Sequence, residues 1–109
     1  MKFTTHTNRA PNFALNAHPT YKWRTAEQGN RTFTLVALGE GTGGWGRNSK
    51  VCGGWGLFVN GKLVWPHALN RASSEYFRPS HSECRAFKNL AESRRAAEAV
   101  AANPSLFCA

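Results

Sequence analysis

The residues best suited to contact a ligand gather in a glycine-rich stretch, GGWGRNSKVCGGWG, at positions 43–56. The tetrapeptide Gly-Gly-Trp-Gly occurs twice in it, and Trp45, Arg47 and Lys50 lie in or after the first copy. An indole can stack on a nucleobase, while Arg and Lys can neutralise phosphates. Glycine lets the chain turn sharply and lets a partner approach the backbone closely. We therefore expect these three side chains at a binding surface.

The two tryptophans of this stretch also have a structural interpretation, in which both are core residues that pack over glycine backbone. Trp55 begins an apolar run, so we expect it to be held in a strand, while Trp45 is the more exposed of the two. A phosphate-binding loop is excluded, because the order of glycines does not lead into Gly-Lys-Ser/Thr at the start of a helix.

Metal binding and catalysis have weaker support in the sequence. His81 and Cys84 are at helical spacing, but a structural zinc site needs four ligands and no Cys-x-x-Cys pair completes the set. The three cysteines are too few and too widely spaced for a disulfide framework, so we expect reduced thiols. The chain contains no Asp that could orient a histidine and shows no nucleophile motif. We expect a non-catalytic protein without metal or cofactor.

The charge of the chain favours an acidic partner. Fourteen Lys and Arg residues stand against six acidic residues, which gives a formal net charge of +8 over 109 residues. Such a charge favours a polyanion or an acidic protein surface. The first residues contain no apolar run typical of a signal peptide, and no segment has the length of a membrane span. We therefore expect a cytoplasmic protein with no membrane partner.

The strands that would position these residues follow from alternation and turn signals. YKWRT at 21–25 predicts a strand with Lys22 and Arg24 on one face and the aromatic residues on the other. TFTLVAL at 32–38 predicts a central strand, joined to the first by a turn near Gly29. Residues 1–20 are expected to be irregular, apart from an edge strand in KFTTHT at 2–7.

The most specific local signal is Asn60-Gly61 between two apolar runs, which predicts a two-residue hairpin turn. Strand alternation then places Phe58 and Leu63 on one face. The other face receives Trp55 and further apolar residues, so both faces need a cover or a partner.

A helix is expected from about 81 to 102, after a connector at 66–79 with at most one short helical turn. Ser80 and Glu83 form a capping-box pattern, and Asn103-Pro104 ends the helix. Phe87 and Leu90 are expected to dock it on the sheet. Arg94 is expected either to pair with Glu98 or to face a partner. A basic face of this helix is expected at Arg85, Lys88 and Arg95.

Together these features predict one α+β domain spanning 1–109, in which a small antiparallel sheet of three to five strands, at about 21–66, packs on one long C-terminal helix. The function favoured is a basic module that contacts RNA or DNA through cations and exposed aromatics. The alternative is a small inhibitor or adaptor, of the anti-CRISPR kind found in phages and mobile elements, that docks on an acidic protein of a nucleic-acid-handling complex. The expected contact residues are Lys22, Arg24, Trp45, Arg47, Lys50, Arg85, Lys88 and Arg95.

Overall fold

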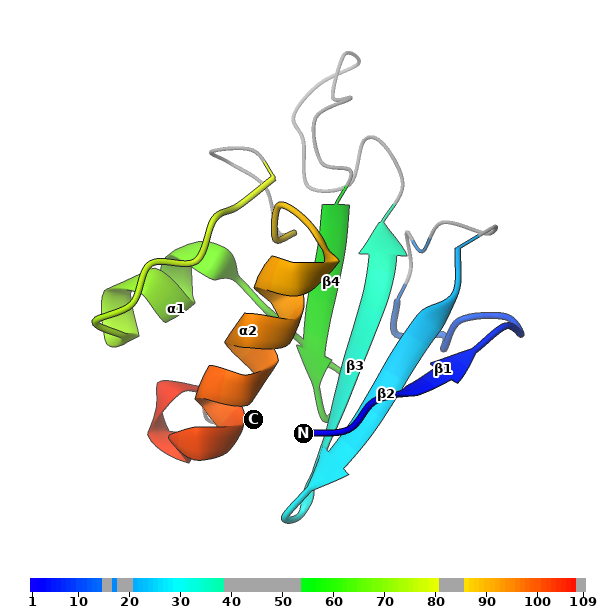
Figure 1. Cartoon of the computed structure of the whole chain (residues 1–109), viewed down its shortest axis with the longest axis horizontal. Coiled ribbons are helices and arrows are strands. Elements are labelled where there is room, and N and C mark those ends of the chain that lie inside the picture. The colour runs from blue at the N-terminus through cyan, green and yellow to red at the C-terminus, as the bar shows by residue number, and fades with distance from the viewer. Residues whose placement is uncertain (15–16, 18–20, 39–53, 81–85, 108–109) are drawn as a thin grey trace.

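Five antiparallel strands form one sheet in the order of the sequence, and a C-terminal helix packs on it (Figure 1). The computed structural model describes residues 1–14, 17, 21–38, 54–80 and 86–107. The α+β class and the antiparallel sheet are as predicted. The elements are β1 Thr4–His6, β2 Trp23–Gln28, β3 Arg31–Leu38, β4 Gly54–Val59, β5 Lys62–Val64, α1 Pro66–Ala72, α2 Leu90–Ala102 and a 3-10 turn at Pro104–Leu106.

The hairpin predicted at Asn60-Gly61 is confirmed. Both residues have positive φ, 53° and 81°, which is the conformation that a two-residue turn of this type requires. The register pairs Val59 with Lys62 and Phe58 with Leu63. The turn thus fixes which side chains of β4 and β5 reach each face.

The two faces of the sheet carry separate hydrophobic clusters, divided as the alternation predicts. Leu57, Val59 and Val64 belong to the larger cluster, into which α2 inserts small residues. The side chains that α2 buries are Ser93, Ala96, Ala97 and Val100. Because these side chains are small, the helix axis can lie close to the strands beneath it.

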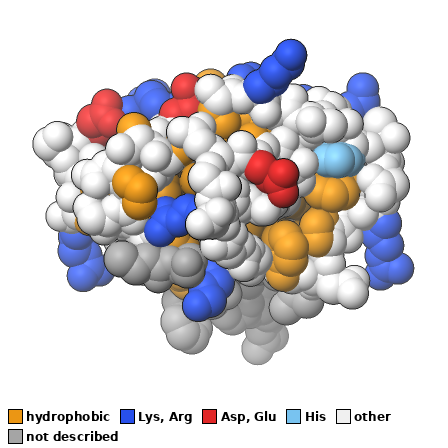
Figure 2. Space-filling model, turned by 90° about the horizontal axis from the view of Figure 1, so that it is seen from below, with side chains coloured by type: hydrophobic (Ala, Val, Ile, Leu, Met, Phe, Trp, Pro, Cys, Tyr) orange, Lys and Arg blue, Asp and Glu red, His pale blue; other side chains and the backbone are white. Residues whose placement is uncertain are grey.

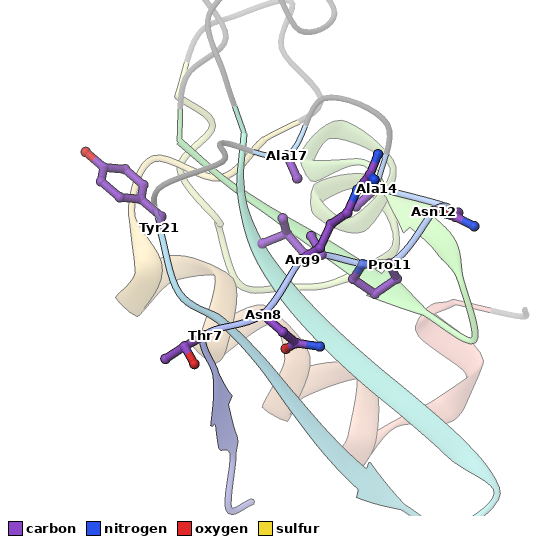
Figure 3. A pocket seen from close by; sticks show the side chains of 10 residues that line it. Thr7, Asn8, Arg9, Pro11, Asn12, Ala14, Ala17 and Tyr21 are labelled. Atoms are coloured by element: carbon purple, nitrogen blue, oxygen red, sulfur yellow. The ribbon is translucent and has the colours of Figure 1, made fainter.

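The opposite face is covered by the N-terminal segment. Val36, Leu38 and Phe58 form the second cluster with Ala14 of that segment. The ring of Phe13 lies 5.2 Å from that of Phe58. A chain stretch without regular structure therefore does on this face what α2 does on the other. A pocket of about 770 Å³ lies between this segment and the sheet (Figure 3).

The prediction of one long helix from 81 to 102 was wrong in its start. Helix α2 begins at Leu90 and has 13 residues. Its N-cap is Asn89, whose side-chain oxygen accepts a hydrogen bond from the backbone N–H of Glu92 at 2.9 Å. The helix is thus capped by the pattern Asn-x-x-Glu at Asn89, nine residues after the Ser80 cap that the sequence predicted.

Just before α2, Phe87 forms an isolated antiparallel bridge with Trp55 of β4. The backbone N–H groups of Trp55 and Phe87 each donate to the other's carbonyl oxygen, at 3.0 and 2.8 Å. Phe87 therefore occupies the position beside β4 that β5 leaves open when it ends at Val64. Phe87 is completely buried, but as part of the sheet and not as the docking residue of a helix, while Leu90 is half-buried.

Gly54 allows this pairing. A Cβ atom at Gly54 would lie 2.5 Å from the carbonyl oxygen of Phe87, and the φ of Gly54 is +116°. Both the close approach and the backbone angle exclude a side chain there. Gly54 therefore has a structural role, and Trp55 lies in β4 as predicted.

The connector between sheet and helix is ordered by α1 and by one side chain. Asn70 of α1 accepts a hydrogen bond from the backbone N–H of Phe77 at 2.7 Å and donates one to its carbonyl oxygen at 2.9 Å. Phe77 is completely buried and meets Phe87 edge to face, with ring centroids 6.4 Å apart. The segment after α1 is thereby fixed against the core.

Candidate nucleic-acid interface beside helix α2

Helix α2 leaves part of its face of the sheet uncovered. It packs on β3 and β4, while β1 and β2 extend beside it (Figure 1). On β2, Arg24 pairs with Leu35, which in turn pairs with Leu57. Directly paired residues of a sheet point to the same face, so Arg24 shares the face of α2. This face therefore carries an arginine where the helix does not reach.

Arg24 and Trp55 together line a shallow hollow. Its volume is about 470 Å³, and its other described lining residues are Tyr21 and Lys22. The guanidinium carbon of Arg24 lies 5.4 Å from the centre of the Trp55 ring, within the range of a cation–π contact. Tyr21 is 59% exposed. The hollow thus combines two cations with two aromatic rings, one on β4 and the other just before β2.

The guanidinium of Arg24 is positioned by the indole and not by a hydrogen-bond acceptor. Within the described part of the chain, both ion pairs belong to Arg95, and no carboxylate or carbonyl oxygen binds the Arg24 side chain. Arginine presents a planar fork of five N–H donors. Those of Arg24 are therefore available to an external acceptor.

A second arginine–aromatic pair lies on the same side of the sheet. The guanidinium of Arg94, on α2, lies 5.3 Å from the ring centre of Phe3, just before β1. Arg94 is exposed, and among the described residues it forms no ion pair with Glu98. Of the two outcomes expected for Arg94, pairing with Glu98 is not observed. Phe3 carried no recognisable signal in the sequence, because its role depends on β1 pairing with β2.

Arg95 has intramolecular partners. Its guanidinium donates to the carbonyl oxygen of Tyr76 at 2.6 Å and to Glu92 at 3.0 Å, and it lies 4.3 Å from the ring centre of Phe77. The backbone N–H of Arg78 donates to the same Glu92 carboxylate and, with Arg95, holds the pKa of Glu92 below its usual range. Arg95 therefore ties the connector to α2.

Among the other expected contact residues, Lys88 and Arg95 lie in the described part of the chain, and neither lines this hollow. Lys88 is exposed, and its backbone N–H bonds the carbonyl oxygen of Arg78 at 2.8 Å, but its side chain does not line the hollow. The remaining expected residues lie outside the described part of the chain; they are Trp45, Arg47, Lys50, Arg85 and the two weak metal candidates His81 and Cys84.

The larger pocket under the N-terminal segment is less suited to an anion. Arg9 is the one Lys or Arg among its described lining residues, and the side chains of Thr7, Asn12 and Tyr21 point outward in different directions (Figure 3). In the view of Figure 2, Lys and Arg side chains stand at separate places with hydrophobic side chains between them. Basic residues occur on several sides of the molecule. What distinguishes the Arg24 hollow from the rest of the surface is that cations and aromatic rings lie together in it.

Comparison with protein-family models, curated proteins and solved structures found no match to the chain. In the described residues, no helix is long and apolar enough to cross a membrane. Nor do those residues contain a group of three or more His, Cys, Asp or Glu side chains placed to hold a metal ion. The class of protein is therefore defined by the α+β fold alone, and the function must be argued from the site.

Proposed function

We propose that this protein is a non-catalytic basic module that binds nucleic acid through the face beside α2. The observation that carries the proposal is Arg24, whose guanidinium lies over Trp55 and binds no acceptor within the described residues. A planar guanidinium held by an aromatic ring has lost part of its rotamer freedom, so less entropy is lost when it binds a phosphate.

The surroundings of Arg24 fit a phosphate ligand. Lys22 lies in the same hollow, and Arg94 is exposed on the neighbouring helix. Phosphate neutralisation by such cations releases counterions, which supplies most of the sequence-independent affinity for nucleic acids. Arg47 and Lys50 come between β3 and β4 in the sequence, outside the described residues. We keep them as predicted contributors, because β4, which follows them in the chain, contains Trp55.

The test compares Arg24→Gln with Arg71→Gln. Arg71 is an exposed arginine in the last turn of α1, so this control removes the same charge at another place. Binding of labelled single- and double-stranded oligonucleotides is measured by fluorescence anisotropy between 50 and 200 mM salt, a range in which phosphate contacts change affinity strongly. We expect Arg24→Gln to weaken binding about 5- to 10-fold and to reduce the salt slope by about 0.7 to 0.9, the value of one lost contact.

Two outcomes would contradict the proposal. One is that the parent protein binds neither form of oligonucleotide at the lowest salt concentration. The other is that Arg24→Gln and Arg71→Gln weaken binding equally, which would mean that only the net charge of the protein affects its affinity. A protein partner that remains bound after nuclease treatment, and that Arg24→Gln loses, would instead favour the docking of this face on an acidic protein.

A further inference from the structure

We infer that the face beside α2 takes single-stranded nucleic acid, with one unstacked base in the hollow formed by Tyr21, Lys22, Arg24 and Trp55. This inference rests on the proposed function and names the form of its ligand. The juxtaposition that carries it is a hollow with both aromatic and cationic walls, on the part of the sheet face that α2 leaves uncovered.

The aromatic walls are useful only to an unstacked base. In a duplex the bases are stacked on one another, and the surface shows phosphates and groove edges. A duplex phosphate would contact Lys22 and Arg24 but would make no stacking contact with the rings of Tyr21 and Trp55. A single strand can place its phosphates on the cations and turn a base onto a ring or onto the guanidinium plane of Arg24. The hollow, at about 470 Å³, is within the size range of small-molecule sites.

The Arg94–Phe3 pair extends this arrangement along the sheet. Thr5 on β1 pairs with Arg24, and Phe3 lies two residues before Thr5 on the same chain. Two residues of a strand span about 7 Å. Two arginine–aromatic pairs therefore lie one behind the other beside α2. A single nucleic-acid strand bound between the helix and β1 would contact both pairs. A row of rings and cations is the usual surface for single strands.

Helix α2 is poorly suited to a duplex groove. Its apolar side, with Ala96, Ala97 and Val100, is buried against the sheet. On the exposed side Arg94 is followed one turn later by Glu98, and Arg95 has intramolecular partners. A recognition helix contacts base edges in the major groove with the side chains of its exposed face. The exposed side of α2 therefore offers few side chains that could contact base edges.

The experiment leaves the protein unchanged and varies the ligand. The parent chain is titrated with four labelled probes of matched length: oligo-dT, oligo-U, an abasic DNA strand with the same number of phosphates, and a hairpin duplex. Base stacking contributes about 1–3 kcal/mol per base, so we expect the abasic strand to bind roughly 5- to 150-fold more weakly than oligo-dT. The duplex is expected to bind no more tightly than the abasic strand at equal salt. The oligo-dT and oligo-U arms distinguish DNA from RNA, and the inference is supported if either one binds more tightly than the abasic strand and the duplex.

Equal binding of abasic and base-bearing strands, or tighter binding of the duplex, would overturn this inference while leaving the proposed function intact. Failure of all four probes to bind would overturn both. A protein variant gives an independent check, since Trp55→Phe keeps an aromatic ring and Trp55→Leu removes it. With both variants shown to be folded by circular dichroism, loss of the preference for oligo-dT over the abasic strand is expected only in Trp55→Leu. Retention of the preference in Trp55→Leu would exclude the hollow as the stacking site.

Discussion

Arg24 and Arg95 both lie over aromatic rings and nevertheless have different environments. Arg95 lies over Phe77 and also binds a carbonyl oxygen of the connector and the Glu92 carboxylate. Arg24 lies over Trp55, and within the described residues its guanidinium has no oxygen partner. Burial differs as well, because Phe77 is completely buried and Trp55 is half-buried.

The comparison shows that a cation–π contact alone does not identify a binding residue. An arginine whose donors are satisfied inside the molecule stabilises the fold. One whose donors remain available can bind a ligand, which is the role that we propose for Arg24. Removing the first should therefore change stability, and removing the second should change binding. Both consequences can be measured in the same set of variants.

The largest difference is expected when the ring beneath each arginine is removed. Phe77→Ala should lower the free energy of unfolding by about 3–5 kcal/mol, because a buried aromatic is lost and a cavity remains. Trp55→Leu should cost less, since Trp55 is partly exposed and leucine fills part of its volume. Urea denaturation followed by circular dichroism measures both. An equal or larger loss for Trp55→Leu would show that the two regions are equally structural.

A smaller difference is expected for the arginines themselves. Arg95→Gln should destabilise the protein by about 1 kcal/mol, a modest value because the side chain is 41% exposed and solvent screens its ion pairs. Arg24→Gln should change stability by less than about 0.5 kcal/mol, as surface substitutions usually do. Thermal unfolding of the two variants beside the parent tests this. If Arg24→Gln proved the more destabilising, Arg24 would be a structural residue and the proposed site would lose its support.

The smallest effect concerns the acid dependence of the Arg95 region. In the folded protein the pKa of Glu92 is lowered from the ordinary value of 4.5, with the backbone N–H of Arg78 as the main cause. A lowered folded pKa stabilises the protein above the unfolded pKa, and this contribution disappears as the pH falls through the folded value. Below about pH 4.5 the parent should therefore lose more stability than Glu92→Gln does, by about 0.5 kcal/mol or less.

Glu98→Gln is the matched control for this measurement, since Glu98 is an exposed carboxylate on the same helix. Unfolding free energies at pH 6 and pH 3 are compared among the three proteins. Parallel acid dependence in the parent and Glu92→Gln would mean that the hydrogen bonds to this carboxylate do not stabilise the fold.

The sequence by itself determined the features that depend on neighbouring residues. Asn60-Gly61 predicts its turn, because the positive φ that these two residues tolerate is a local property. Alternation then assigned Phe58 and Leu63 to one face and Leu57 to the other, as the two clusters confirm. The end of α2 before Pro104 is equally local, since proline has no N–H to continue the helix.

Tertiary structure alone decided the start of α2 and the roles of the two arginines. The capping pattern at Ser80–Glu83 was a reasonable local signal, but Phe87 is drawn into the sheet by its pairing with Trp55, thirty-two positions away. Arg95 and Arg24 are chemically identical, and only the packing of the connector supplies partners to one of them. Contacts between residues distant in the chain depend on the whole fold, and no spacing within a short segment encodes them.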